Sequence, residues 1–436
     1  NDGALQQTME RLYHLFRNAP NLGSLVDPDI VLSQQPLLIN DYESIQKLLT
    51  MVLDHRRHTE DIVTTLFGET VRGVSQAAVL LTRSYTVVTT NVPYLARGKQ
   101  ASILAEHCQR YYENAKGDLA TVFVARLQAL TAPGGTYALV TPQNWLFATS
   151  YTDFRQELLR RQTWGCLIWL GAGAFTTISG EVVQPVLYIA SNMSPIDNHN
   201  FWGLDLSSQD SAQENSRKLQ DDTVVLFSQA DQLRHPDSRV VLLDMTASEL
   251  MSKYAASYQG MKTGDDSRYR RRFWEIYPLT NRWCPYQSTV RETMNYGGLE
   301  YILDWKNEGA DMARLQGGPA WGKPGVVVSL LGDLKSCLYT GERFDSNVAA
   351  LVPHNSHHLP AIWAFCKSSE FNSLVRAIDR RMNAMTGSLT KIPFDYAHWK
   401  SVSDRSESIP TPYSNDPTQW LFKGNPAEAT DPLQVA

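Results

Sequence analysis

The chain lacks any apolar run close to the roughly 20 residues that a helix needs to cross a membrane. No signal peptide is visible. The five cysteines are scattered, and no pair of them has the spacing of a zinc knuckle. These absences argue against a membrane partner, a disulfide framework and a structural metal site. They predict reduced thiols in a cytoplasmic protein.

An excess of positive charge is also missing, because the formal net charge is −5. Any affinity for nucleic acid must therefore come from a local basic face. The 436 residues are 43% hydrophobic and 19% charged, as in ordinary globular proteins, and this length allows two or three domains. The chain starts at Asn1 rather than methionine and ends in an apolar stretch, so we expect a piece of a longer polypeptide.

The most informative motif present is the tetrad Asn91-Val92-Pro93-Tyr94. It follows the run 85–90, whose β-branched residues predict a buried strand. Proline cannot continue that strand, so the chain must turn there. An amide, a backbone carbonyl and an aromatic ring are thus presented together at a strand's carboxyl end, where open α/β sheets place their chemistry.

The first part of the chain, 1–240, alternates helical and extended patterns, which predicts the α/β class. Residues 1–80 are expected to be mainly helical, followed by the strand and turn over 85–94. Further helices are expected over 118–130 and 154–159, and further strands over 137–140, 167–170 and 182–190. Residues 191–240 are polar and look like a connecting region within this part.

The second part has a different composition. Tryptophans and tyrosines alternate with arginines over 241–400, and the strands look short, which predicts a second, mixed α/β domain. Residues 401–436 are rich in Ser, Pro, Asp and Asn, so we expect an extended linker or arm there.

Several other blocks occur in a fixed order after the tetrad. They are 134–145 (GGTYALVTPQNW), 174–175 with 178–183 (AF and ISGEVV), 260–266 with 272–275 (GMKTGDD and RFWE), 344–346 (FDS) and 389–393 (LTKIP). Together with the tetrad, they resemble the large adenine-specific DNA methyltransferases of type IIG restriction and BREX (PglX-like) phage-defence systems. The resemblance implies the downstream part of a Rossmann-like class I methyltransferase sheet in 1–240 and a target-recognition domain in 241–400.

The resemblance also implies an activity, the S-adenosylmethionine-dependent methylation of the adenine N6 amine in double-stranded DNA. The adenine must be flipped out of the duplex to be reached. Its amine is a poor nucleophile because the lone pair is delocalised into the ring. The Asn91 side-chain oxygen and the Val92 carbonyl would accept its protons and localise that lone pair. Tyr94 and Phe175 would stack on the two faces of the base.

Three departures from the family pattern concern the tetrad and the methyl donor. Val92 stands where the family has proline, and Thr86 stands where an acidic residue is usual. No Phe-x-Gly-x-Gly loop, which holds S-adenosylmethionine in the family, precedes Asn91. The cofactor-binding residues are therefore unassigned, and this fragment alone is expected to be inactive. Gly171-Ala172-Gly173 is better explained as a hairpin turn, because a strand rather than a helix is expected next.

Candidate DNA contacts lie at the start of the second part. They are Lys262, Arg268, Arg270, Arg271 and Arg272, with Lys323 and Lys391 as weaker candidates. A solvated charged face is the alternative explanation for such a cluster. The histidines at 354, 357 and 358 lie in a polar loop without cysteine or paired acidic residues nearby, so no metal site is expected there.

Two other functions remain open at this point. Without a donor loop, the chain is also consistent with a non-catalytic DNA-binding specificity module. The parent protein is also consistent with a bifunctional restriction endonuclease and methyltransferase. Duplex DNA is the expected partner in each case, and other subunits of a defence system are further candidates.

Overall fold

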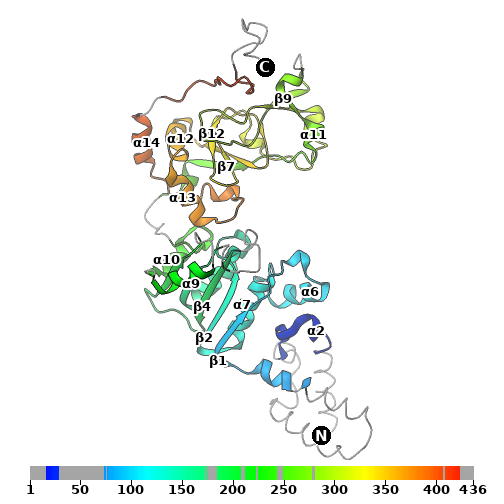
Figure 1. Cartoon of the computed structure of the whole chain (residues 1–436), viewed down its shortest axis with the longest axis vertical. Helices are drawn as coiled ribbons and strands as arrows, with labels where there is room; N and C mark the ends of the chain where they lie inside the picture. The colour runs from blue at the N-terminus through cyan, green and yellow to red at the C-terminus, as the bar shows by residue number, and fades with distance from the viewer. Residues whose placement is uncertain are drawn as a thin grey trace, which may run out of the picture. The chain divides into compact units, whose positions relative to one another are not determined.

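The computed structural model describes residues 16–28, 73–74, 76–171, 174, 184–207, 212–221, 224–242, 249–276, 280–405 and 408–422. The chain divides into two compact units, Asn1–Arg239 and Val240–Ala436 (Figure 1). Of the helical segment expected over 1–80, the structure describes α2 (Ala19–Leu22), η1 (Gly23–Leu25) and helical residues at 73–74 and 76–82. The rest of that prediction lies outside the described residues. No helix in the described ranges is long and apolar enough to span a bilayer.

A six-stranded sheet forms the centre of the first unit, in the order β1-β2-β4-β3-β5-β6. The strands are β1 (Tyr85–Asn91), β2 (Thr131–Pro142), β3 (Thr163–Trp169), β4 (Pro185–Ser191), β5 (Asn200–Asp205) and β6 (Val225–Ser228). β1, β2, β3 and β5 run in one direction, while β4 and β6 run in the other. The expected α/β class is confirmed, and each strand expected from sequence is present within a few residues.

The helices of this unit include the two expected from sequence and three that were not expected. They are α6 (Ser102–Tyr111), α7 (Leu119–Leu130), α8 (Thr152–Arg161), α9 (Ala212–Asp221) and α10 (Gln229–Arg234), with single 3-10 turns η2 (Arg97–Lys99), η3 (Gln143–Leu146), η4 (Thr149–Tyr151) and η6 (Pro236–Ser238). Helix α7 starts at the predicted place because the Asp118 carboxylate accepts a hydrogen bond of 2.9 Å from the backbone N–H of Ala120. Both predicted helices, α7 and α8, are confirmed.

The expectation of a connecting region over 191–240 was wrong. Strands β5 and β6 extend the sheet there, and β5 buries Phe201 completely while Trp202 is 56% exposed. This alternation fits a strand with one covered face. The polar composition comes from the exposed face of β5 and from α9, whose described side chains are mostly exposed.

The expectation that strand 85–90 is buried was also wrong. β1 pairs with β2 and is the end strand of the sheet within the described residues. None of its residues is buried, and Val87 is 65% exposed. The β-branched sequence predicted the strand correctly, but an end strand has one neighbour and therefore less cover.

The second unit contains two four-stranded sheets, ordered β13-β9-β10-β8 and β12-β11-β14-β7. The strands are β7 (Ala255–Gln259), β8 (Arg270–Arg272), β9 (Trp283–Gln287), β10 (Tyr301–Asp304), β11 (Gly325–Ser329), β12 (Ser336–Tyr339), β13 (Arg343–Phe344) and β14 (Val348–Pro353). The helices are α11 (Asp266–Tyr269), α12 (Leu359–Cys366), α13 (Ser369–Ile378) and α14 (Tyr396–Asp404). Short 3-10 turns are η7 (Met251–Lys253), η8 (Phe273–Glu275), η9 (Lys306–Gly309), η10 (Gly318–Ala320), η11 (Ser356–His358) and η12 (Thr386–Ser388).

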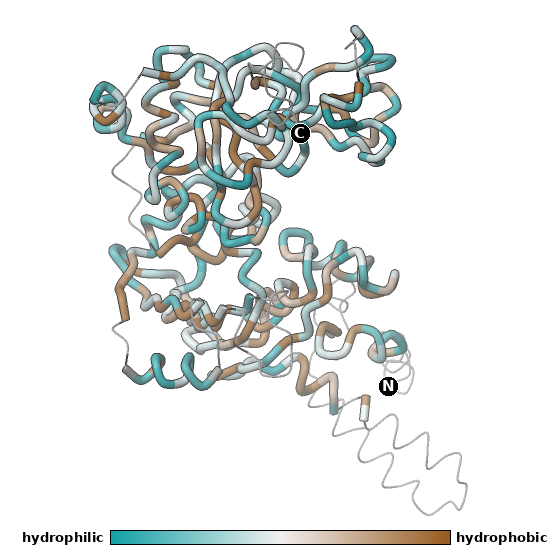
Figure 2. Tube along the Cα trace, turned by 45° about the horizontal axis from the view of Figure 1, so that its top comes forward, coloured by the Kyte–Doolittle hydropathy of each residue, from teal (hydrophilic) through white to brown (hydrophobic). Residues whose placement is uncertain are grey.

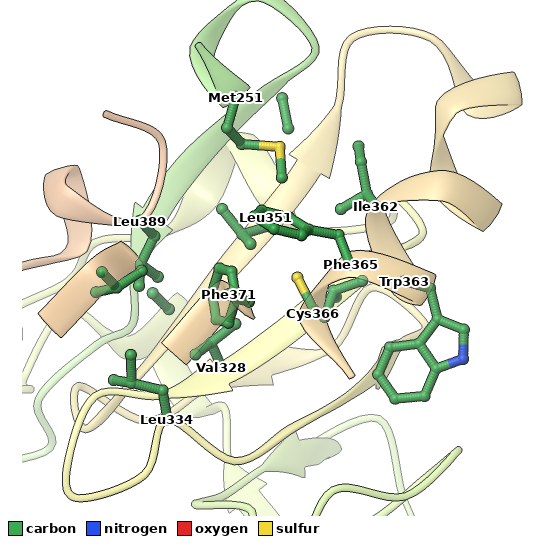
Figure 3. Packing of buried hydrophobic residues seen from close by; sticks show 14 of the residues in the cluster. Met251, Val328, Leu334, Leu351, Ile362, Trp363, Phe365, Cys366, Phe371 and Leu389 are labelled. Atoms are coloured by element: carbon green, nitrogen blue, oxygen red, sulfur yellow. The ribbon is translucent and has the colours of Figure 1, made fainter. Parts of the chain in front are cut away.

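The core of this unit lies between the β11-containing sheet and helices α12 and α13. Side chains from both elements meet there, including Val328, Leu351, Phe365 and Phe371 (Figure 3). All five residues of β11 are buried, so this central strand is covered on both faces. Hydrophobic segments run through the interior of the unit, and polar segments lie around it (Figure 2).

Part of the C-terminal segment expected as a linker or arm is docked on the second unit. The Tyr296 hydroxyl donates to the Pro410 carbonyl over 2.8 Å, and the Leu299 N–H donates to the Gln419 side-chain oxygen over 2.7 Å. Ile409 and Trp420 pack against the core. These contacts hold 408–422 as an extended strap along the unit.

Candidate active site and nucleic-acid interface

The tetrad lies at the carboxyl edge of the six-stranded sheet. Asn91 is the last residue of β1 and is paired in register with Val140 of β2. The parallel strands β3 and β5 end at the same edge, where Trp169 is paired with Asp205. Polar groups from several strand ends therefore face one edge, which is the usual position of a ligand site in such sheets.

The four residues of the tetrad have different surroundings. Asn91 and Pro93 are exposed, whereas the Val92 side chain is 5% exposed and fixes the turn against the unit. Among the described residues, the Asn91 amide has no hydrogen-bond partner. The Asn91 side chain is thus held at a strand end with its hydrogen-bonding groups unused.

Tyr94 is half-buried. Its hydroxyl is buried and has no partner among the described residues. Burial of the phenol and, to a smaller extent, the negative charge of Asp118 together raise the pKa of Tyr94 to about 12. The phenol is therefore neutral at physiological pH, and it adds no charge beside the amide.

Asp118 anchors the turn that carries the tetrad. Besides capping α7, its carboxylate accepts a hydrogen bond of 3.3 Å from the Leu95 N–H. The Leu119 N–H donates to the Leu95 carbonyl over 3.0 Å, and the Arg97 N–H donates to the Gly117 carbonyl over 3.0 Å. The chain just after Tyr94 is thereby tied to the first turn of α7. Sequence reasoning missed this role, although an aspartate directly before an apolar helical run is a recognisable cap signal.

The block 134–145 supports the sheet rather than the site edge. Trp145 is 1% exposed and packs at 5.4 Å against the Tyr188 ring and at 5.9 Å against the Trp164 ring. Its indole N–H donates to the Thr141 hydroxyl over 2.9 Å. Trp145 of this block therefore contributes to the hydrophobic core of the first unit. Packing alone accounts for the presence of this residue, and no chemical role is needed.

The glycine at the end of β3 has a structural reason. Gly171 has φ +69°, and a Cβ there would lie 2.5 Å from the Cα of Ser207, after β5. The antiparallel pairing of β3 with β4 agrees with the hairpin interpretation. Phe175, the second predicted stacking residue, lies outside the described residues.

The described residues do not fit a complete site for S-adenosylmethionine. Such a site needs a glycine-rich turn between a parallel strand and a helix. Gly171 serves the approach of two strand ends, and no other turn in the described part of this sheet has that arrangement. The described part of the site edge thus presents the Asn91 amide at a strand end, without a recognisable pocket for a methyl donor.

The predicted arginine cluster is brought together on α11 and β8, but its members are not equivalent. Arg270 pairs with Asp345 at 3.1 Å and with Asp266 at 3.2 Å. Arg272 pairs with Glu300 at 2.6 Å, and its guanidinium lies 4.2 Å from the centre of the Tyr301 ring. These two guanidinium groups are already neutralised within the fold.

The other predicted contacts are more available. Arg268 is exposed, with its guanidinium 4.9 Å from the Tyr269 ring centre. Arg271 donates to its neighbour's backbone carbonyl over 2.7 Å and to the Ser267 carbonyl, and it has no acidic partner among the described residues. Lys262 is exposed next to this segment. The charges free to meet DNA are therefore fewer than the sequence suggests.

The histidine loop offers no metal centre. His354 lies 3.1 Å from the Ser252 carbonyl, and His358 packs edge-on against the Tyr254 ring. In the described part of the chain, no three metal-binding side chains come together.

Comparison with known proteins shows what this chain is similar to. Residues 33–174 match the Eco57I restriction-modification methylase family. The match contains the tetrad, β1 and β2. The chain is also 24% identical to the adenine-specific methyltransferase PglX of Lacticaseibacillus casei (strain Zhang), over 81% of this chain and 33% of that protein. It is 23% identical to the adenine-specific methyltransferase BrxX of Escherichia coli O9:H4 (strain HS), over 97% of this chain and 36% of that protein.

The resemblance inferred from the tetrad and the ordered blocks is therefore confirmed. The chain spans about a third of the length of these two relatives. Among solved structures, it is similar to the type IIL restriction-modification enzyme MmeI in complex with DNA, with a TM-score of 0.47 and 10% identity over 73% of this chain and 48% of that one. It is also similar to a nuclease-deletion mutant of the type ISP restriction-modification enzyme LlaGI in complex with a DNA substrate mimic. The TM-score is again 0.47 and the identity 10%, over 86% of this chain and 39% of that one.

Proposed function

We propose that the intact protein is a site-specific DNA adenine N6-methyltransferase of a restriction or phage-defence system. This chain would supply the pocket for the flipped base and part of the DNA recognition. The observation that carries the proposal is the exposed Asn91 amide, which is unpartnered among the described residues at the carboxyl edge of the sheet. The match of 33–174 to the methylase family and the two adenine-specific relatives support it.

The chemistry follows from what the turn offers. The Asn91 side-chain oxygen accepts a hydrogen bond from one N–H of the adenine amine, and the Val92 backbone carbonyl accepts a hydrogen bond from the other. These two hydrogen bonds raise the electron density on the amine nitrogen as it becomes positively charged. Preorganised acceptors of this kind stabilise the transition state without a strong base. The half-buried, neutral Tyr94 ring stacks on the base, which contributes roughly 1–3 kcal/mol.

The methyl donor we propose is S-adenosylmethionine, which supplies an electrophilic methyl group when bound. Its site lies outside the described residues of this chain. The intact protein is thus the proposed catalyst. If the donor site is absent from the protein altogether, the alternative is a non-catalytic DNA-binding module. Titration of the intact protein with S-adenosylmethionine distinguishes the two, because the module would not bind it.

The second unit is the proposed target-recognition part, and duplex DNA is its proposed partner. Arg268, Arg271 and Lys262 are the proposed phosphate or base contacts, because they are exposed or lack an acidic partner in the described structure. Arg270 and Arg272 remain candidates, but they would have to exchange a carboxylate for DNA. Other defence-system subunits are further proposed partners. All five cysteines are free thiols, which supports the proposed cytoplasmic location.

The test is Asn91→Ala in the intact protein. Loss of one preorganised group of this kind should lower the methylation rate by about 100-fold or more. Asn144→Ala is the matched control, since Asn144 is an exposed asparagine just after the neighbouring strand β2. Methyl transfer into DNA and thermal unfolding should be measured for both. An unchanged rate in Asn91→Ala would overturn the proposal.

A further inference from the structure

Arg343, at the start of β13, lies between two tryptophans. Its guanidinium carbon is 4.5 Å from the ring centre of Trp305 and 5.1 Å from that of Trp321. The two indoles meet edge to face, with ring centres 5.5 Å apart. Contacts of this kind favour a cation and restrict the plane of the guanidinium.

The residues around this arginine hold the arrangement in place. The Gly322 N–H donates to the Gly341 carbonyl over 2.8 Å. Gly341 has φ +113°, and a Cβ there would lie 2.8 Å from the Cα of Gly322, so only glycine lets these two loops approach so closely. Gly309 similarly leaves room for Trp305, whose ring would lie 2.9 Å from a Cβ at that position. The loops that carry both tryptophans and Arg343 are therefore fixed by backbone contacts.

The charge of Arg343 is not compensated within the described structure. Arg270 and Arg272 of β8 in the same sheet, and Arg282 directly before β9, each pair with a carboxylate. Arg343 is half-buried, and its side chain makes no ion pair or hydrogen bond with a described residue.

Two donors in the cluster are unsatisfied. The Nε of Arg343 is buried without a partner, as is the Trp321 indole nitrogen. The neighbouring Glu342 carboxylate hydrogen-bonds to Thr340 instead, and burial raises its pKa. Partly burying a guanidinium without a counter-charge costs free energy. The position of Arg343 therefore points to an acceptor on a bound molecule.

We propose that Arg343 is a preformed DNA contact that donates two hydrogen bonds to a pair of acceptors. A phosphodiester provides such a pair through two oxygens, and a guanine provides it through O6 and N7. The inference rests on the DNA binding proposed above and adds a residue that lies outside the arginine segment 268–272. The two tryptophans act as positioning residues that present the guanidinium.

The experiment compares Arg343→Met with Arg291→Met in the intact protein. Arg291 is an exposed arginine of the same unit, so the control removes the same charge without the tryptophan contacts. Each variant is used to select duplexes from a random DNA library, and its affinity is then measured over a range of salt concentrations. Arg343→Met should weaken binding about 5- to 150-fold. Arg291→Met should change it by no more than about twofold.

The pattern of the loss identifies the acceptor. A uniform loss across sequences with a salt slope smaller by about 1 indicates a phosphodiester. A loss confined to sequences with one particular G·C pair indicates a guanine edge. Arg343→Lys keeps the charge and should recover part of the phosphodiester contact but little of the guanine contact.

Other outcomes contradict the inference. If Arg343→Met selects the same DNA with the affinity of the unsubstituted protein, the inference is overturned and the proposed function is untouched. If the unsubstituted protein binds no duplex DNA, the proposed function fails and this inference fails with it. Thermal unfolding of both Arg343 variants shows whether a loss comes from misfolding, and Arg343→Lys tests the contact if the methionine variant does not fold.

Discussion

The tetrad at Asn91 and the arginine segment 268–272 are both polar motifs that the sequence singles out, but the fold treats them in opposite ways. In the tetrad, the backbone is fixed by Asp118 while the Asn91 amide has no partner among the described residues. In the arginine segment, Arg270 and Arg272 are neutralised by carboxylates from distant parts of the chain. A reactive-looking residue is available for a ligand only where the fold leaves its polar groups unused.

The comparison distinguishes polar residues that stabilise the fold from those that are available to bind a ligand. A guanidinium that pairs with a buried carboxylate stabilises the fold, and its removal leaves the carboxylate buried without a counter-charge. An amide that faces solvent contributes little to stability, so its removal should affect only what it binds. Substitutions in the two regions should therefore differ in which property they change.

The largest effect on stability is expected for Arg270→Ala. Its side chain is 19% exposed and that of its partner Asp345 is 10% exposed, so the substitution leaves a mostly buried carboxylate without its cation. We expect the free energy of unfolding to fall by about 3 kcal/mol. Arg271→Ala, with no acidic partner in the described structure, should change it by no more than about 0.5 kcal/mol. The unfolding transition of the second unit in denaturant gives the free energy of unfolding of each variant. Equal values for Arg270→Ala and Arg271→Ala would contradict the difference drawn here between paired and unpaired arginines.

A smaller effect, on activity rather than stability, is expected for Tyr94→Ala. Loss of a stacking ring should weaken the methylation step by roughly 1–3 kcal/mol, which is about 5- to 150-fold in kcat/KM. Tyr94→Phe keeps the ring and removes a buried hydroxyl without a partner in the described structure, so it should keep activity and not lower the melting temperature. Activity lost in both variants would show that the hydroxyl, not the ring, matters.

The smallest effects are expected for Arg268→Ala and Arg271→Ala on DNA binding. Each should lower affinity modestly and reduce the slope of log affinity against log salt by about 1 if it contacts a phosphate. Neither should change thermal unfolding, because Arg268 is exposed and Arg271 bonds only to backbone carbonyls in the described structure. If the slope of log affinity against log salt were the same as in the unsubstituted protein, these residues would not contact a DNA phosphate.

Most of the first unit's elements were predictable because their signals are local. Helix α7 has apolar residues at helical spacing and a downstream proline-glycine segment, and it begins at Leu119, one residue after the expected start. Strand β1 has a run of β-branched residues. Strands β5 and β6 were missed because each is short and has apolar residues on its exposed face, such as Trp202 and Leu226. Their sequences therefore lack the alternation of apolar and polar residues that indicates a strand.

The site could be predicted only in part, for a similar reason. The amide at Asn91 and its turn follow from neighbouring residues. The pairing of Arg270 with Asp345 joins residues 75 apart, and no local pattern indicates it. The cluster of Arg343, Trp305 and Trp321 was missed because these residues come from three separate segments of the chain, so no local sequence pattern indicates that they meet.

The hydrogen bonds at the base of the turn have a consequence for how this protein can change over evolution. Between Leu95 and Asp118 the chain makes an excursion that contains η2 and α6 and returns to its starting point. Because the two ends are joined to each other, we expect insertions at exposed positions of the excursion to leave Asn91 in place, whereas the buried Leu104 and Cys108 of α6 must be kept. An exposed position in this stretch is therefore where we would graft a foreign segment while preserving the geometry beside it.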